Sequence, residues 1–161
     1  MPERETIERA RRDKRQGKSP STQAGEFVRQ EMHHIREGKH GARNTKQAIA
    51  IGLNKARRAG VKLGTPRGVS PQTRRSAQSA TRHAGQKPSR TRSRAVEGAL
   101  KREGHSAASH EALASHARTT ARRRGAAARH RAAEKAVRTK GSAGRRAAAR
   151  KAARTRKRRA T

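Results

Sequence analysis

The chain has 161 residues, and its 44 Lys and Arg residues against 11 Asp and Glu residues give a formal net charge of +33. Only fourteen residues are Leu, Ile, Val or Phe, and there is no Cys. This composition argues against a compact enzyme, a disulfide-bonded domain and a membrane-spanning protein. So large an excess of positive charge calls for a polyanionic partner.

The N-terminal arm, residues 1–18, is predicted to be a charged helix that frays. Two Glu/Arg pairs lie four residues apart in it, and each such pair stabilises a helix by about 0.2–0.5 kcal/mol. Ile7 is the one large apolar residue after the initiating methionine. The arm therefore offers little surface for packing.

Residues 19–63 contain nine of the sixteen Leu, Ile, Val, Phe and Met residues, in two successive helical patterns. Ser19 precedes a proline, which is a typical helix start, and Gly38 ends the first pattern. Asn44, with Gln three residues later, resembles a capping box, and Gly60 ends the second pattern. The short connection between them favours an antiparallel pair, so we predict a helical hairpin over residues 19–63.

The rest of the chain has few large apolar residues. Residues 64–92 are rich in Gly, Pro, Ser and Thr and are predicted to be a basic flexible linker. Residues 93–124 predict a weak helical pair. Residues 125–161 are mainly Ala, Arg and Lys, and we expect a disordered tail that becomes helical when phosphates neutralise it. The predicted fold class is all-α, with a small helical hairpin, weak extra helices, and an extensive disordered linker and tail.

Part of the hairpin resembles a known family. The residues that carry the likeness are Lys46-Gln47-Ala48-Ile49-Ala50-Ile51-Gly52-Leu53, followed by Ala56-Arg57-Arg58-Ala59-Gly60-Val61-Lys62. They are similar to the shared core of small basic bacterial and phage proteins, in which a helix and a Gly-Lys-x-His loop come first, as in Glu37-Gly38-Lys39-His40-Gly41. The resemblance covers about residues 20–64 and implies no particular activity. Asn54 and Lys55 stand where other members often have Ser and Glu.

The tail, residues 125–161, resembles the Ala/Lys/Arg tails of linker-histone-like bacterial proteins in composition. That resemblance implies compaction of DNA by charge neutralisation.

Two long stretches of the sequence contain basic residues and no acid. Residues 38–96 hold fifteen Lys and Arg residues and residues 135–161 hold twelve. Arg outnumbers Lys 32 to 12, and its guanidinium binds phosphate in bidentate fashion. We therefore predict nucleic-acid binding without sequence preference, to DNA more than RNA, in the cytoplasm and nucleoid of a bacterial or phage setting. The candidate phosphate-binding residues are Lys39, Arg43, Lys46, Lys55, Arg57, Arg58, Lys62, Arg122, Arg123, Arg124, Arg145, Arg146, Arg150, Lys151, Arg154, Arg156, Lys157, Arg158 and Arg159.

Two alternatives stay open. An RNA-binding or ribosome-associated protein has the same charge signature. A membrane-active cationic protein belongs to another class, but it needs an amphipathic face of Trp, Phe or Leu, which the tail lacks. We expect no membrane insertion, and we expect a second copy of the chain to be a candidate partner for the hairpin.

The sequence predicts no enzyme, no cofactor and no metal site. Eight His residues are present, and His33, His34 and His40 are close in sequence. Adjacent histidines diverge on a helix, and neither Cys nor a nearby acid completes a site of defined geometry. No Ser/His/Asp arrangement stands out, and the chain has little core in which to bury one.

Overall fold

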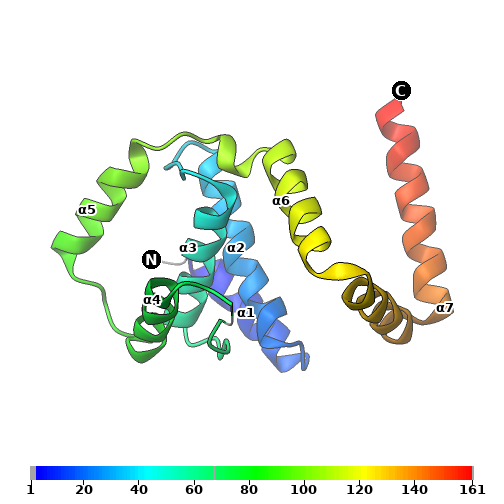
Figure 1. The fold of residues 1–161 in the computed structure, drawn as a ribbon, viewed down its shortest axis with the longest axis horizontal. Coiled ribbons are helices and arrows are strands. Elements are labelled where there is room, and N and C mark those ends of the chain that lie inside the picture. The colour runs from blue at the N-terminus through cyan, green and yellow to red at the C-terminus, as the bar shows by residue number, and fades with distance from the viewer. Residues whose placement is uncertain (1–2, 67, 161) are drawn as a thin grey trace. The chain divides into compact units, whose positions relative to one another are not determined.

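The computed structural model describes residues 3–66 and 68–160, and every regular element in these ranges is helical, which confirms the all-α class (Figure 1). The chain divides into two units, residues 1–116 and residues 117–161. The elements are α1 (Arg4–Arg15), α2 (Pro20–Arg36), α3 (Thr45–Arg58), α4 (Pro71–Arg82), α5 (Arg90–Lys101), the 3-10 turn η1 (Ser106–Ala108), α6 (His110–Arg123) and α7 (Gly125–Ala160).

The two central helices begin where the sequence predicts. The Ser19 hydroxyl accepts a hydrogen bond from the Thr22 backbone N–H at 3.4 Å, with proline at the first position of α2. The Asn44 side chain accepts from the Gln47 N–H at 2.9 Å, at the start of α3. The Gln47 side chain in turn accepts from the N–H of Arg43 at 2.7 Å, one residue earlier than a capping box requires. These bonds satisfy donors that a helix N-terminus otherwise leaves unpaired.

Both helices end in the same glycine motif. Gly60 has a φ of 86° and donates to the Arg57 carbonyl, while the next residue, Val61, donates to Ala56, both at 3.0 Å. This is the Schellman pattern, which needs a residue with positive φ. Gly38 ends α2 with the same motif and has a φ of 73°.

Helices α2 and α3 pack against each other and form the centre of unit 1. Phe27 and Ile35 are fully buried there, and burying a side chain of this size stabilises the fold by about 1.5–3 kcal/mol. The helices cross closely at Gly52, where a Cβ would lie 2.7 Å from the Cα of Val28. This arrangement agrees with the helical hairpin that the sequence predicts over residues 19–63.

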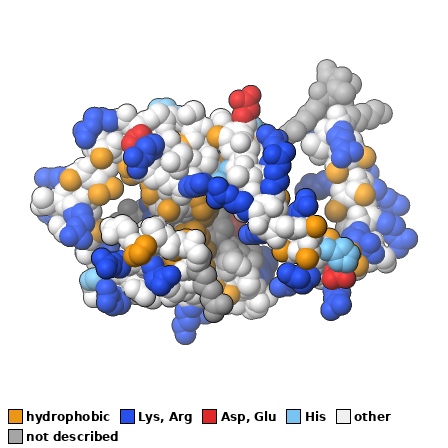
Figure 2. Space-filling model, viewed as in Figure 1, with side chains coloured by type: hydrophobic (Ala, Val, Ile, Leu, Met, Phe, Trp, Pro, Cys, Tyr) orange, Lys and Arg blue, Asp and Glu red, His pale blue; other side chains and the backbone are white. Residues whose placement is uncertain are grey.

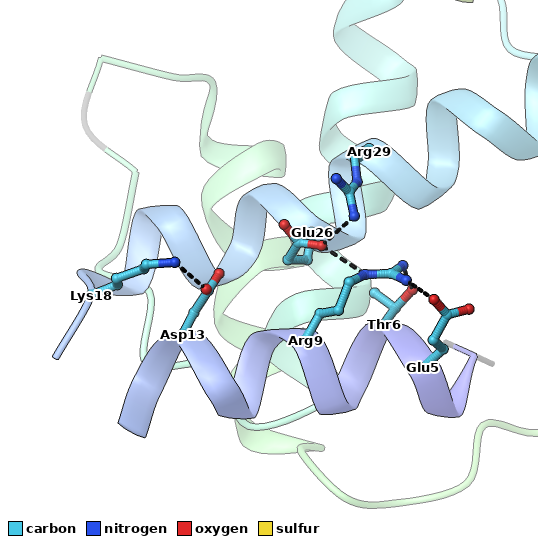
Figure 3. A network of polar contacts seen from close by, with 7 residues as sticks. All are labelled: Glu5, Thr6, Arg9, Asp13, Lys18, Glu26 and Arg29. Atoms are coloured by element: carbon cyan, nitrogen blue, oxygen red, sulfur yellow. Dashed lines mark hydrogen bonds and ion pairs between the residues drawn. The ribbon is translucent and has the colours of Figure 1, made fainter. Parts of the chain in front are cut away.

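The arm forms a helix that packs on α2 rather than remaining without contacts. Thr6, Ala10 and Asp13 are buried on its inner face. Figure 3 shows the polar network between α1 and α2, in which Arg9 is central. Its Nε donates to Glu26 Oε2 at 2.8 Å, and its other nitrogens bond Thr6 and the Glu5 carboxylate. The arm docks because its buried residues are small and its inner charges are paired.

Part of the predicted linker is the helix α4, which packs on α3. Ser70 caps it through a bond from the Thr73 N–H at 3.2 Å, and Pro71 occupies its first position. Its buried residues are Ala77 and Ala80. The expected absence of structure was therefore wrong for residues 71–82, since two alanines suffice for a short helix to pack closely.

The end of α5 and the segment that follows it are tied to the loop between α2 and α3 and to the start of α3. Gly41 donates to the Leu100 carbonyl at 2.9 Å, and the Thr45 hydroxyl donates to the Ala107 carbonyl at 2.7 Å. Ala107 is buried in η1, and so is its neighbour Ala108. A Cβ on Gly41 would lie 1.9 Å from the Glu103 carbonyl oxygen, so this position requires glycine.

The described part of the tail is helical, which corrects the expected disorder. Ala and Arg are the residues with high helix propensity, and they make up most of α7. Gly141, with a φ of 62° and a ψ of −178°, interrupts α7 and divides it into two helices. The high helix propensity of Ala and Arg accounts for the helical conformation on either side of Gly141.

Candidate nucleic-acid interface

Acidic residues of the N-terminal helices form ion pairs with neighbouring cations. Glu26 accepts from Arg9 at 2.8 Å and from Arg29 at 2.9 Å, and Asp13 accepts from Lys18 at 2.7 Å (Figure 3). Most of the chain's few carboxylates are thus neutralised inside unit 1. Among the described side chains, the Lys and Arg residues that pair with carboxylates are Arg9, Lys18, Arg29, Lys39, Lys55 and Lys101.

Two of the candidate phosphate-binding residues point into the fold. Lys55 pairs with the fully buried Glu31 at 2.5 Å. Arg57 is 7% exposed and donates to the Gly64 carbonyl at 3.3 Å. Burial lowers the pKa of the Arg57 guanidinium below its ordinary value. Lys55 and Arg57 therefore serve the fold, and we leave them out of the candidate surface.

The remaining candidate phosphate-binding residues of the hairpin differ in their exposure and in whether they pair with a carboxylate. Lys39 is exposed, but it pairs with Glu37 at 3.0 Å and lies 3.8 Å from Glu3. The hydrogen bond to Glu37 raises the pKa of Lys39. Arg58 is half-buried and donates to the Gln86 carbonyl at 3.1 Å. The hairpin candidates that are exposed and have no carboxylate partner among the described side chains are Arg43, Lys46 and Lys62.

The candidates in unit 2 are all exposed where the structure describes their side chains. Figure 2 shows Lys and Arg side chains spread over the visible face, with few acidic ones between them. The only acid in α7 is Glu134, which lies 3.6 Å from His130. Lys157 and Arg159 lie outside the described side chains. The exposed candidates are Arg122, Arg123, Arg124, Arg145, Arg146, Arg150, Lys151, Arg154, Arg156 and Arg158.

The sequence missed further exposed cations on α4 and α5. Arg74 and Arg75 are exposed on α4, and the exposed residues Arg90, Arg92 and Arg94 lie in the first turns of α5. None of these side chains has a carboxylate within ion-pair distance in the described part of the chain. The absence of any acid between residues 38 and 96 was the signal that could have identified them.

The arrangement favours contact with phosphates over contact with an apolar surface. Val137 is the only large apolar residue in residues 125–161, so α7 has no apolar stripe along its length. The described helices include none that is long and apolar enough to cross a membrane. Exposed guanidinium groups with no carboxylate nearby suit phosphate oxygens, which they bind with two parallel hydrogen bonds.

Comparison of the chain with protein-family models, with curated proteins and with solved structures finds no significant match. The function is therefore argued from the surface itself.

Proposed function

We propose that the protein binds nucleic acid through its phosphates and without sequence preference, with DNA favoured over RNA, as a nucleoid-associated protein does. The observation that carries the proposal is the set of exposed, carboxylate-free cations on α4 to α7. A surface that serves only solubility mixes both signs of charge. Here one sign dominates.

The proposed contacts are electrostatic and weakly directional. Cations on the second helix of α7 point in different directions, since Arg145, Arg146 and Lys151 lie at about 0°, 100° and 240° around the helix at about 100° per residue. A surface of this kind does not present a defined set of side chains to base edges, which sequence reading requires. Phosphate binding releases condensed counterions, and the affinity is then strongly dependent on salt.

Single-stranded nucleic acid is a weaker candidate for the ligand. Binding of single strands usually relies on aromatic side chains on which bases stack. Phe27 is the only aromatic residue of the chain, and it is fully buried. Duplex DNA, or structured RNA, fits the surface better.

The experiment measures binding of the full chain to a labelled DNA duplex, a labelled structured RNA of equal length, and anionic lipid vesicles, at matched salt. We expect the DNA duplex to bind most tightly and the vesicles to show no leakage. Tighter binding to the RNA would identify RNA, and not DNA, as the partner. Absence of binding to both nucleic acids at low salt would refute the proposal.

A further inference from the structure

A cluster of three side chains between α2 and the loop that follows it is separate from the proposed nucleic-acid surface. Glu31 is fully buried, while His34 and His40 are half-buried. One carboxylate oxygen and one nitrogen of each ring lie within 4.8 Å of one another. Glu31 and His34 are three residues apart on α2 and therefore share a face of the helix.

The hydrogen bonding of His40 leaves a lone pair facing the carboxylate. Nδ1 of His40 lies 3.1 Å from the carbonyl oxygen of Gly41, which accepts hydrogen bonds and cannot donate them. In the neutral ring the proton is therefore on Nδ1, and Nε2 carries the lone pair. Nε2 lies 3.3 Å from Glu31 Oε1, which has no hydrogen-bond partner among the described residues. Two acceptors that face each other in a buried place require a positive charge between them, supplied either by a second proton on the ring or by a metal ion.

The separation of these two atoms fits a metal ion. Ligand atoms about 2.0–2.1 Å from a tetrahedral Zn²⁺ ion lie about 3.3 Å apart along an edge of the tetrahedron. This agrees with the 3.3 Å between Nε2 of His40 and Oε1 of Glu31. The position of His34 within the same cluster supplies a third ligand atom.

Neighbouring groups hold the three side chains in place, as outer partners of metal ligands do. Lys55 pairs with the other carboxylate oxygen of Glu31 at 2.5 Å. Glu3 lies 2.8 Å from Nε2 of His34 and holds that ring in place. The Gly41 carbonyl orients His40.

We propose that Glu31, His34 and His40 form a three-ligand site for a divalent transition-metal ion, with Zn²⁺ the ion that best suits two imidazoles and one carboxylate. Water would complete the coordination. The ion would tie the loop over residues 37–44 to α2, beside the place where Gly41 donates to the Leu100 carbonyl at the end of α5. The sequence predicts no metal site because no acid was expected to complete one beside these histidines, but Glu31 precedes His34 by three residues.

The test uses the full chain, stripped of metal by a chelator, in the absence of nucleic acid. Zn²⁺ affinity and stoichiometry are measured by competition with a chromophoric chelator, and Co²⁺ is used as a spectroscopic probe. The variants are His40→Gln and His34→Gln, with His33→Gln as the matched control, because His33 is exposed on the same helix. Circular dichroism establishes that each variant is folded.

We expect one tight Zn²⁺ per chain, a four-coordinate Co²⁺ spectrum, and a thermal midpoint that rises with Zn²⁺ in the original chain and in His33→Gln. Each ligand variant should lose at least about tenfold in affinity, since even outer partners of a metal site are worth 10–100-fold. The proposal is overturned if no tight site is found, or if His33→Gln loses as much affinity as the ligand variants. It would then be a proton on His40 that separates the two acceptors. Neither result bears on nucleic-acid binding.

Discussion

Replacing five exposed cations of the second helix of α7 by glutamine should weaken the salt dependence of DNA binding by a calculable amount. Glutamine and arginine have similar helix propensities, so the helix is kept while the charge is removed. The substituted residues are Arg145, Arg146, Arg150, Lys151 and Arg154, all exposed and without a carboxylate partner among the described side chains.

The magnitude follows from the geometry of the helix and of the duplex. Residues 141–160 span about 30 Å at about 1.5 Å per residue. A duplex presents one phosphate charge per about 1.7 Å, so phosphates are in excess along this length. Each contact contributes about 0.9 to the slope of log affinity against log salt. The slope should become shallower by about 4.5 if all five residues bind, and by about 2 if only the side facing the duplex does.

The assay is fluorescence anisotropy of a labelled duplex at a series of salt concentrations. The control changes Arg145, Arg146, Arg150 and Arg154 to lysine, which keeps every charge at the same positions. We expect the control to retain the slope of the original chain. The reasoning would be refuted if the slope of the glutamine variant changes by less than about 1. It would also be refuted if the slope of the lysine control changes as much as that of the glutamine variant.

Three further predictions concern the fold. Gly52→Ala should lower the free energy of unfolding by about 1–3 kcal/mol, because the new Cβ meets the backbone of Val28; urea denaturation measures it. Gly41→Ala should release the segment after α5, seen as faster amide exchange at residues 100–108, whereas unchanged exchange would contradict the close approach. The hydrogen bond from Lys101 holds the pKa of Glu97 below its ordinary value. The pair should therefore stabilise α5 above the ordinary carboxylate pKa, and this stabilisation should be lost as the pH falls through the lowered pKa. An NMR titration should show the pKa returning to its ordinary value in Lys101→Gln.

The sequence predicts those elements whose ends carry a specific signal. Ser19, Asn44 and Gly60 each act by local chemistry, namely a side-chain cap or a positive φ, and the structure confirms α2 and α3 at these positions. Ser70 followed by proline is the same signal as Ser19, yet the lack of large apolar residues in residues 71–82 favours a linker. Helix α4 packs through Ala77 and Ala80. Counts of large residues underestimate such close packing of alanines.

The docking of distant segments could not be predicted from spacing. The bond from Thr45 to the Ala107 carbonyl joins residues 62 positions apart, and no local pattern indicates it. The same holds for the inward orientation of Lys55 and Arg57, which follows from the position of Glu31 and of the Gly64 carbonyl. The exposed cations of the tail were predictable, because charge without neighbouring acid is a property of composition.

The central claim is most directly tested by the salt dependence of binding of the unmodified full chain to two DNA duplexes of equal length and unrelated sequence. We predict equal affinities for the two duplexes and a slope of log affinity against log salt steeper than about −5, as expected for six or more phosphate contacts. A slope near zero, no binding at low salt, or a preference of about a thousandfold for one duplex would contradict the account.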